Sequence, residues 1–443
     1  MTVWHRVKEA VRRRFDVESR TLFRNSSWFF IANANGAVCD FLRSVVVARG
    51  LGAESLGIYI LVTSLVRTIQ EFCNLNVGSA VVKFGAEYKS ANETTHLAAL
   101  LKGVFYLSGL TALASIGVVG IVSVLSYDTF FSRPGLQPYL QLYAIAASLS
   151  FFDSVSVSLL NLYFRFRLNS VIKMLLDITE LAILALAVWL RPGDLTVLLW
   201  AAVTALLFKG AVYNGAALWE MRELIVPNLR VGFDEIRADR RRIGAFLVNN
   251  SLSRTVHSMI FSGDVLLLGA LAGPREVGYY SIAKKLAFAI LRLTDPLQSA
   301  IFPQLATLVA QRNLASVTLM LKKISGALGA VIMAIFLVAL AVSGWLLPAI
   351  YGPEFGPAST AFTILVAAAG IGASLFWSTS LIVSLGRVNA RLRAYLAALF
   401  VSAPLAWFLV PTLGATGLAM AMLAAIVTMQ SVLVTVCRLE LRR

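Results

Sequence analysis

The chain has 443 residues, of which 58% are hydrophobic and 14% are charged. Soluble domains are roughly half apolar and about a quarter charged, so this composition excludes an ordinary soluble domain and places the chain in a lipid bilayer. The formal net charge of +16 fits either a nucleic acid or a membrane surface as partner, and the positions of the basic residues distinguish the two.

Residues 1–26 form a basic, amphipathic, cytoplasmic segment ahead of the first apolar stretch. That stretch is interrupted by Asp40 and Arg43 and is too long for a cleaved signal peptide, so we interpret it as the first membrane span. A bilayer core needs roughly 20 apolar residues per helix, and hydropathy predicts twelve such spans. They cover residues 28–48, 56–76, 103–125, 138–161, 173–190, 196–219, 244–271, 277–302, 324–347, 358–385, 393–410 and 413–437.

Lys and Arg are distributed unequally between the two sides of the predicted membrane. Of the 39 basic residues, 28 fall at the termini, in the even-numbered connections or at the first residue of the span that follows one of them, whereas the opposite side holds Arg49, Arg133, Arg191 and Arg275. By the positive-inside rule, both termini are therefore cytoplasmic. We expect a multi-pass protein of the bacterial inner (plasma) membrane, with no nucleic-acid partner.

The longest cytoplasmic connection, residues 220–243, carries six Arg and divides the chain near its middle. We interpret it as a linker between an N-terminal lobe at 27–219 and a C-terminal lobe at 244–443. Such runs also attract anionic phospholipid headgroups, at about 1 kcal/mol per charge. The predicted fold class is all-α integral membrane, with twelve transmembrane helices in two six-helix lobes.

A weak internal repeat relates the two lobes. A shift of 221 residues aligns 51–59 with 272–280, and both segments cover the outer turn between the first two spans of a lobe. Six spans is an even number, so the copies would share one orientation and a pseudo-two-fold axis along the membrane normal. Chance similarity of apolar segments is the alternative. The identical pairs are Gly52 with Gly273, Gly57 with Gly278, and Tyr59 with Tyr280.

Several short motifs carry a resemblance to a known family. They lie at 51–59, 264–281, 302–306, 347–355 and 384–387. With twelve spans, they resemble the polysaccharide transporter, or O-antigen flippase, family of the multidrug/oligosaccharidyl-lipid/polysaccharide exporter superfamily. The resemblance implies two V-shaped lobes around a central cavity and export of an undecaprenyl-diphosphate-linked glycan from the cytoplasmic to the periplasmic leaflet. A polysaccharide polymerase and export machinery are the further partners that it implies.

Charged residues inside the spans are the candidate functional groups, because a charge in mid-bilayer costs about 2.5 kcal/mol or more. The simplest interpretation is neutralisation within one helix, since Asp40 and Arg43, and Arg67 and Glu71, have helical i,i+3 or i,i+4 spacing. Guanidinium groups bind phosphate bidentately and stay charged. The residues that we expect to hold the diphosphate in a cation-rich centre are Arg67, Arg254, Arg292 and Lys284.

The repeat suggests a gating role for four residues. Subtracting 221 carries Asp264 onto Arg43 and Arg292 onto Glu71, so equivalent positions hold opposite charges. Our hypothesis is that Arg43–Asp264 closes the outer side in one state and Glu71–Arg292 closes the inner side in the other. A proton or sodium ion could drive the cycle through Asp40 or Asp264.

Two other functions were weighed. A drug or cation antiporter of the same superfamily is favoured by Asp40 in the first span. An enzyme would need a sizeable polar loop, and the largest outer connections, near 126–137 and 348–357, are short. The chain's three Cys and three His show no ligand spacing, so no resident metal or cofactor is expected.

Overall fold

The structure is a computed structural model that describes residues 3–125, 137–225, 231–248, 263–292, 313–385 and 387–441, together with residues 251, 297, 301, 305, 308 and 311. Within these ranges the regular structure is helical, with no strand. The N-terminal half contains α1 (Val3–Cys73), α2 (Val77–Ser90), α3 (Thr94–Leu125), α5 (Gln137–Ser148), α6 (Ser150–Leu162), α7 (Phe166–Leu190), α8 (Leu195–Ile225) and the short η1 (Phe233–Ile236). The C-terminal half contains α10 (Asp264–Ala272), α11 (Pro274–Arg292), α13 (Leu314–Tyr351), η2 (Pro353–Phe355), α14 (Ala358–Ser374), α15 (Trp377–Ser384) and α16 (Val388–Leu441).

Where the structure describes them, the twelve predicted spans are mostly helical, and parts of the spans at 244–271 and 277–302 lie outside the described residues. Among the described helices, seven are long and apolar enough to cross a bilayer, and two of these, Ser27–Cys73 and Ala390–Leu441, each hold two predicted spans. In α7 and α11, charged residues break the apolar run, and part of the seventh span lies outside the described residues.

Glycines bend the two longest helices where the sequence predicts outer turns. Gly52 in α1 has φ 74° and Gly414 in α16 has φ 52°. L-residues rarely adopt positive φ because Cβ meets the backbone, whereas glycine pays no such cost. Each kink therefore separates two spans within one continuous helix.

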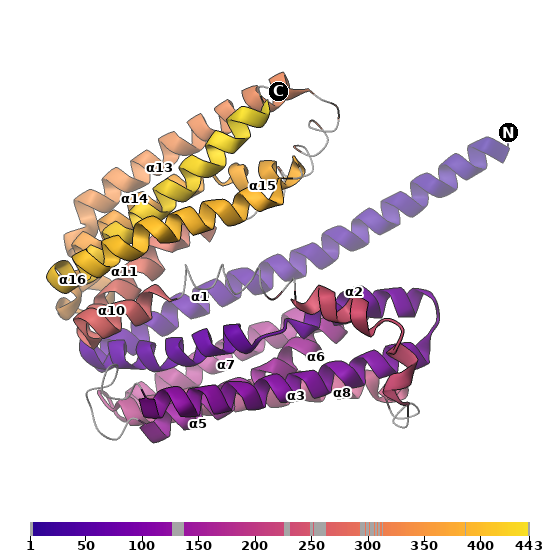
Figure 1. Ribbon diagram of the computed structural model, residues 1–443, viewed down its shortest axis with the longest axis horizontal. Helices are drawn as coiled ribbons and strands as arrows, with labels where there is room; N and C mark the ends of the chain where they lie inside the picture. Colours follow the sequence, from indigo (N-terminus) through magenta and orange to yellow (C-terminus); the bar gives the residue numbers. More distant parts are fainter. Residues whose placement is uncertain are drawn as a thin grey trace. The chain divides into compact units, whose positions relative to one another are not determined.

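Contacts divide the chain into two compact units. Unit 1 comprises Met1–Val47, Ile69–Leu125 and Gly135–Thr255, and unit 2 comprises Ala48–Thr68, Ser126–Pro134 and Val256–Arg443. In unit 1, α3, α5, α6, α7 and α8 run side by side, and in unit 2, α13, α14, α15 and α16 pack together (Figure 1). The predicted lobes at 27–219 and 244–443 stay a prediction. The compact units differ from them, because each unit includes a segment from the other half of the chain.

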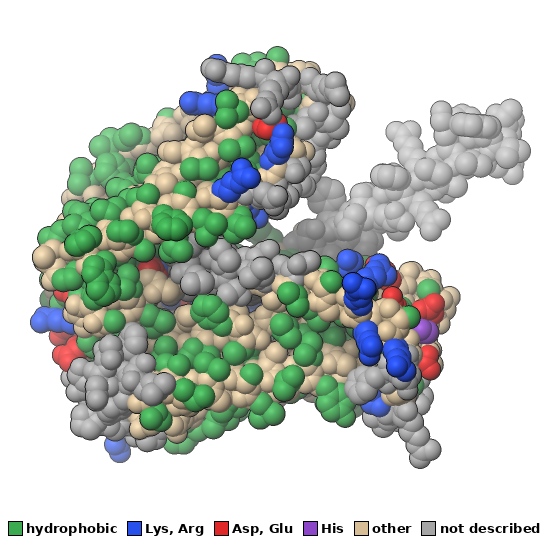
Figure 2. Space-filling view, viewed as in Figure 1, with side chains coloured by type: hydrophobic (Ala, Val, Ile, Leu, Met, Phe, Trp, Pro, Cys, Tyr) green, Lys and Arg blue, Asp and Glu red, His purple; other side chains and the backbone are tan. Residues whose placement is uncertain are grey.

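Exposed apolar side chains lie along the flanks of the helices, as expected for surfaces that face lipid. On the side of unit 1 formed by α3, α5 and α8, hydrophobic groups cover the middle of the bundle and Lys and Arg gather toward one end (Figure 2). In unit 2, the central helix α14 buries mostly small residues, including Ala361, Ala369 and Gly370. Small residues let neighbouring membrane helices approach closely, which explains how α14 contacts α11, α13 and α16.

The repeated glycines meet one another inside unit 2. A Cβ at Gly57 would overlap the carbonyl oxygen of Pro274, and a Cβ at Gly278 would overlap the carbonyl oxygen of Ala53. These contacts are reciprocal, since Ala53 and Pro274 are also 221 residues apart. Such an exchange of equivalent contacts is what a local two-fold relation between the copies produces.

Charged side chains satisfy the backbone groups that the outer turns expose. Arg49 donates from Nε to the carbonyl oxygen of Ile350 over 2.8 Å, and Glu354 Oε2 accepts from the amide of Ala53 over 3.1 Å. Glu276 Oε2 accepts from the amide of Ala415 over 2.7 Å. Helix ends leave such groups without partners, so these bonds fasten the motifs at 51–59 and 347–355 to each other.

The described part of the linker packs on α2 in unit 1. Tyr88 donates to Asp239 over 2.6 Å, and Arg242 pairs with Glu87 over 3.0 Å. The ring of Phe246 packs edge-on against Phe84. Burial and the bond to Asp239 raise the pKa of Tyr88 above its ordinary value, so the phenol keeps the proton that it donates.

Candidate functional site

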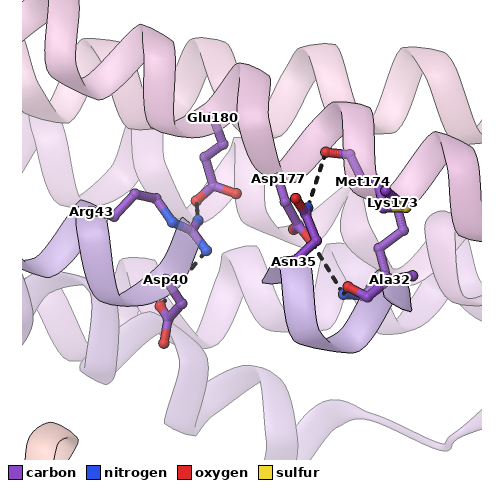
Figure 3. A network of polar contacts seen from close by, with 8 residues as sticks. All are labelled: Ala32, Asn35, Asp40, Arg43, Lys173, Met174, Asp177 and Glu180. Atoms are coloured by element: carbon purple, nitrogen blue, oxygen red, sulfur yellow. Dashed lines mark hydrogen bonds and ion pairs between the residues drawn. The ribbon is translucent and has the colours of Figure 1, made fainter. Parts of the chain in front are cut away.

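A polar network joins α1 to α7 inside unit 1 (Figure 3). Arg43 of α1 pairs with Asp40 one turn earlier, at 3.6 Å, and with Glu180 of α7. The predicted Asp40–Arg43 pair within one helix is thus confirmed, but Glu180 is a second partner that comes from another helix. One guanidinium is bracketed by two carboxylates.

A second layer of the same network lies nearer the start of α7. Lys173 Nζ binds Asp177 Oδ2 over 3.1 Å and the carbonyl oxygen of Ala32 over 3.1 Å. Asn35 donates to the carbonyl oxygen of Met174 over 3.4 Å. The carbonyls of α1 and α7 thereby accept bonds across the helix interface.

Helical spacing explains why these groups meet. Lys173, Asp177 and Glu180 are separated by four and three residues, so they lie on one face of α7. Residue 36 of α1 is Gly, and a Cβ there would come within 2.6 Å of Lys173 Nζ and 2.9 Å of Asp177 Oδ2. The missing side chain makes room for the ion pair.

A separate carboxylate lies between α6 and α8 of unit 1. Asp153 is 6% exposed and accepts a 3.0 Å hydrogen bond from Asn214 Nδ2. Ser156 donates to Asn214 Oδ1 over 2.7 Å, which fixes the orientation of the amide. Lys209 acts electrostatically on Asp153, although no ion pair within 4.0 Å forms at Asp153 among the described residues.

Unit 2 holds a group with the opposite polarity. Asp264, the first residue of α10, accepts a 2.6 Å hydrogen bond from the Tyr280 hydroxyl and forms a 2.5 Å ion pair with Lys284 Nζ. Both partners are on α11 and one helical turn apart. Asp264 is the repeat equivalent of Arg43, so in one half a cation is held by carboxylates and in the other a carboxylate is held by a cation and a phenol.

The remaining predicted site residues are Arg67, Glu71, Arg254 and Arg292. Arg67 is exposed and Glu71 is half-buried. Arg254 and the side chain of Arg292 lie outside what the structure describes. The predicted diphosphate set and both latch pairs therefore stay predictions.

The residues that sequence reasoning missed are mainly partners from neighbouring helices. Lys173 is the first residue of the predicted span at 173–190 and was not singled out, although its i,i+4 spacing to Asp177 is visible in the sequence. Asn214 gave no signal, because a neutral amide in a membrane helix does not stand out by charge. The described networks of unit 1 contain Arg43, Lys173 and Lys209 against Asp40, Asp153, Asp177 and Glu180, so these networks hold more carboxylates than cations.

The described residues contain no group of three or more His, Cys, Asp or Glu side chains that could hold a metal ion. What the arrangement can do is exchange ion-pair partners and protons within a helix bundle. These contacts lie on helices of a multi-pass membrane protein, seven of which, among the described residues, are long and apolar enough to cross a bilayer.

Comparison with known proteins identifies the family. Residues 22–309 match the family described as polysaccharide biosynthesis protein. This match covers more than half of the chain, and the protein belongs to that family. No curated protein sequence matches it.

Solved structures show the same fold. An inward-facing multidrug resistance MATE family transporter of the MOP superfamily has a TM-score of 0.67 and 15% identity, over 92% of this chain and 94% of that one. The lipid II flippase MurJ, in an inward closed conformation, has a TM-score of 0.70 and 12% identity, over 93% and 87% of the two chains. A MOP superfamily transporter from Pyrococcus furiosus, described as having a binding pocket of reversed polarity, has a TM-score of 0.59 and 15% identity, over 95% of each chain.

These likenesses confirm the predicted fold class. The chain has the twelve-helix, two-lobe fold of the multidrug/oligosaccharidyl-lipid/polysaccharide exporter superfamily. The three structurally similar proteins are described as transporters or as a flippase.

Proposed function

We propose that this protein is a flippase that moves an undecaprenyl-diphosphate-linked oligosaccharide from the cytoplasmic to the periplasmic leaflet for surface polysaccharide biosynthesis. The observation that carries the proposal is the combination of a polysaccharide biosynthesis family with a fold shared by a lipid II flippase. A chain that serves glycan synthesis and is built as a carrier most simply carries the glycan.

The diphosphate is the part of such a substrate that intramembrane cations would bind. Guanidinium and ammonium groups can replace the water that the phosphates lose in the membrane. Our proposed contacts to the diphosphate remain Arg67, Arg254, Arg292 and Lys284. Lys284 is already held by Asp264 at 2.5 Å. Substrate phosphate would therefore compete with a carboxylate for this ammonium.

The proposed latches complete an alternating-access cycle. Arg43–Asp264 would close the outer side and Glu71–Arg292 the inner side, each in one state. Both Arg43 and Asp264 have partners within their own units, so forming the outer latch requires an exchange of partners. Such an exchange suits a two-state switch, since ion pairs of similar strength differ little in free energy.

Transport of a labelled substrate tests the function directly. Purified protein in liposomes should move a fluorescent undecaprenyl-diphosphate-linked oligosaccharide between leaflets, read by its accessibility to a membrane-impermeant quencher. Arg43→Asp should reduce the rate at least tenfold, and the double variant Arg43→Asp with Asp264→Arg should recover part of it. Protein-free liposomes are the control, and equal rates with and without the folded protein would contradict the proposal.

A drug or cation antiporter is the second candidate, favoured by the excess of carboxylates over cations in the polar networks of unit 1. Asp40, Asp153, Asp177 and Glu180 outnumber the three basic groups near them. Binding to a polyprenyl diphosphate but not to a cationic dye would support the flippase, and the reverse result would support the antiporter. A proton or sodium ion remains our proposed coupling ion in both cases.

The cellular setting follows from the same proposal. The chain would lie in the bacterial inner membrane with both termini in the cytoplasm, next to anionic phospholipid headgroups, a polysaccharide polymerase and export machinery. It would act as a carrier and not as an enzyme.

A further inference from the structure

Asp153 is placed unlike four other intramembrane carboxylates that the structure describes. Asp40 and Glu180 contact Arg43, Asp177 contacts Lys173, and Asp264 contacts Lys284. Asp153 is 6% exposed, follows the break between α5 and α6 by one turn, and receives its hydrogen bond from a neutral amide. An ionised carboxylate in lipid with one neutral donor is poorly compensated.

Both hydrogens of the Asn214 side-chain amide are used in hydrogen bonds. Its Nδ2 donates to Asp153 Oδ1 over 3.0 Å and to the carbonyl oxygen of Gly210 over 2.8 Å, while its Oδ1 accepts from Ser156. An amide nitrogen has two hydrogens, so neither remains for Asp153 Oδ2. No described residue donates to this second oxygen, which is the place where a proton can sit.

The compensating charge is near but not in contact. Helix α6 packs against α2, α3, α5, α7 and α8, and Lys209 of α8 is the described charged group that acts on Asp153. Tyr213, one turn further along α8, interacts electrostatically with both Asp153 and Asp177. Lys173 is already paired with Asp177 at 3.1 Å. Among the described residues, Lys209 is therefore the cation that can compensate the ionised form of Asp153.

We propose that Asp153 is a proton-binding site, in which the protonated carboxyl is held by Asn214 and the ionised carboxylate is compensated by an approach of Lys209. One proton adds to Oδ2 when the site loads and leaves as the site empties, and no other bond changes. The net charge of the interior of unit 1 then changes by one between the two states. A charge change of this kind is what couples a proton gradient to a conformational cycle.

A proton fits this site better than a metal ion. Hard cations take six or more oxygen ligands, whereas the donors around Asp153 are one carboxylate and an amide whose oxygen is already bonded to Ser156. The ammonium of Lys209 would also repel a cation. A proton needs a single oxygen.

The inference deepens the proposed function, because it assigns the coupling ion of the carrier, yet it can be tested without transport. Infrared difference spectroscopy of the purified full-length protein should show a protonated carboxyl band that titrates with pH. We expect this band to disappear in Asp153→Asn and to remain in Asp177→Asn, the matched control on α7. Lys209→Met removes the cation that stabilises the ionised form, so the titration midpoint should move up by about one pH unit or more.

A second variant keeps the test decisive if Asp153→Asn fails to fold. Asp153→Glu retains a carboxyl and should move the band without abolishing its titration. A band that persists in folded Asp153→Asn, or a spectrum of Asp153→Glu identical to that of the unchanged protein, would overturn the proposal. Because the readout is proton binding, a failed flippase assay with an intact band would reject the substrate and not the site.

Discussion

Arg43 shows how a charge can be retained within a membrane helix. Its side chain is 17% exposed, and its two carboxylate partners, Asp40 and Glu180, are 32% and 34% exposed. Removing one member of a buried pair costs more than the pair contributes, because the remaining charge stays in a medium that solvates it poorly. Arg43 is thus the residue on which the α1–α7 interface depends most.

Replacing Arg43 with Leu should destabilise the protein by about 3 kcal/mol, near the lower end for buried pairs because both carboxylates keep about a third of their exposure. Thermal unfolding in detergent would measure the loss. The double variant Arg43→Leu with Glu180→Leu should lose less than the sum of the two single variants, since it removes the uncompensated charge together with its partner. Strict additivity would show that the two side chains do not interact.

At this scale the sequence predicted contacts within a helix better than contacts between helices. Asp40 and Arg43 have i,i+3 spacing, which dictates proximity in any helix, and the structure places them together. Glu180 is 137 residues from Arg43, and no local pattern says which helix lies beside α1. Asn214 and Ser156 were missed for a related reason, because neutral polar side chains in a membrane helix differ little from lipid-facing ones by composition alone.

Among the elements, the close crossing of the two repeat copies is the feature that depends most on residue size. Gly57 and Gly278 are both in helices, and each lets the backbone of the other copy approach to contact. The backbone cannot move away as a flexible side chain can, so any added Cβ must separate the helices.

Gly57→Ala should therefore cost more than about 3 kcal/mol, above the usual range for an overpacked core, and Gly278→Ala should behave alike. The matched control is Gly329→Ala in α13, where a Cβ meets nothing within 4 Å. Alanine in a helix is favoured over glycine by roughly 1 kcal/mol, so this control should be neutral or slightly stabilising. Yield of folded protein on size-exclusion chromatography and the unfolding temperature would both report the difference.

Hydropathy predicted the elements, but not their interruptions. The span at 138–161 is two helices, α5 and α6, and the span at 358–385 is also two, α14 and α15. Neither break contains Pro or Gly: Leu149 separates the first pair, and Leu375 and Phe376 separate the second. A hydropathy average over a window of about 20 residues does not detect breaks of one or two residues. The kinks at Gly52 and Gly414, in contrast, fall where the sequence predicted outer turns.

At the scale of the whole molecule, each half of the chain contributes a segment to the compact unit that is built mainly from the other half. Residues 48–68 of the first half belong to unit 2, and residues 231–255, beyond the chain's midpoint, belong to unit 1. The sequence could predict two halves, because the charge-rich connection at 220–243 and the repeat mark them. It could not predict the exchange, which depends on contacts such as Gly57 with Pro274 and Tyr88 with Asp239.

This exchange of segments predicts that two fragments of the chain, divided within the linker, remain associated. Two fragments, 1–226 and 227–443, expressed together should purify as one complex when a single fragment carries the affinity tag. The second fragment contributes Asp239, Arg242 and Phe246 to the surface of α2, where they meet Tyr88, Glu87 and Phe84. The first fragment contributes Gly57 to unit 2.

Variants of the first fragment test these attachments. Adding Gly57→Leu and Tyr88→Ala should remove both attachments and lower the amount of recovered partner fragment at least tenfold. Gly117→Leu, on a face of α3 with nothing within 4 Å, should leave that amount unchanged. Fragments that never copurify would mean that the linker alone holds the halves together.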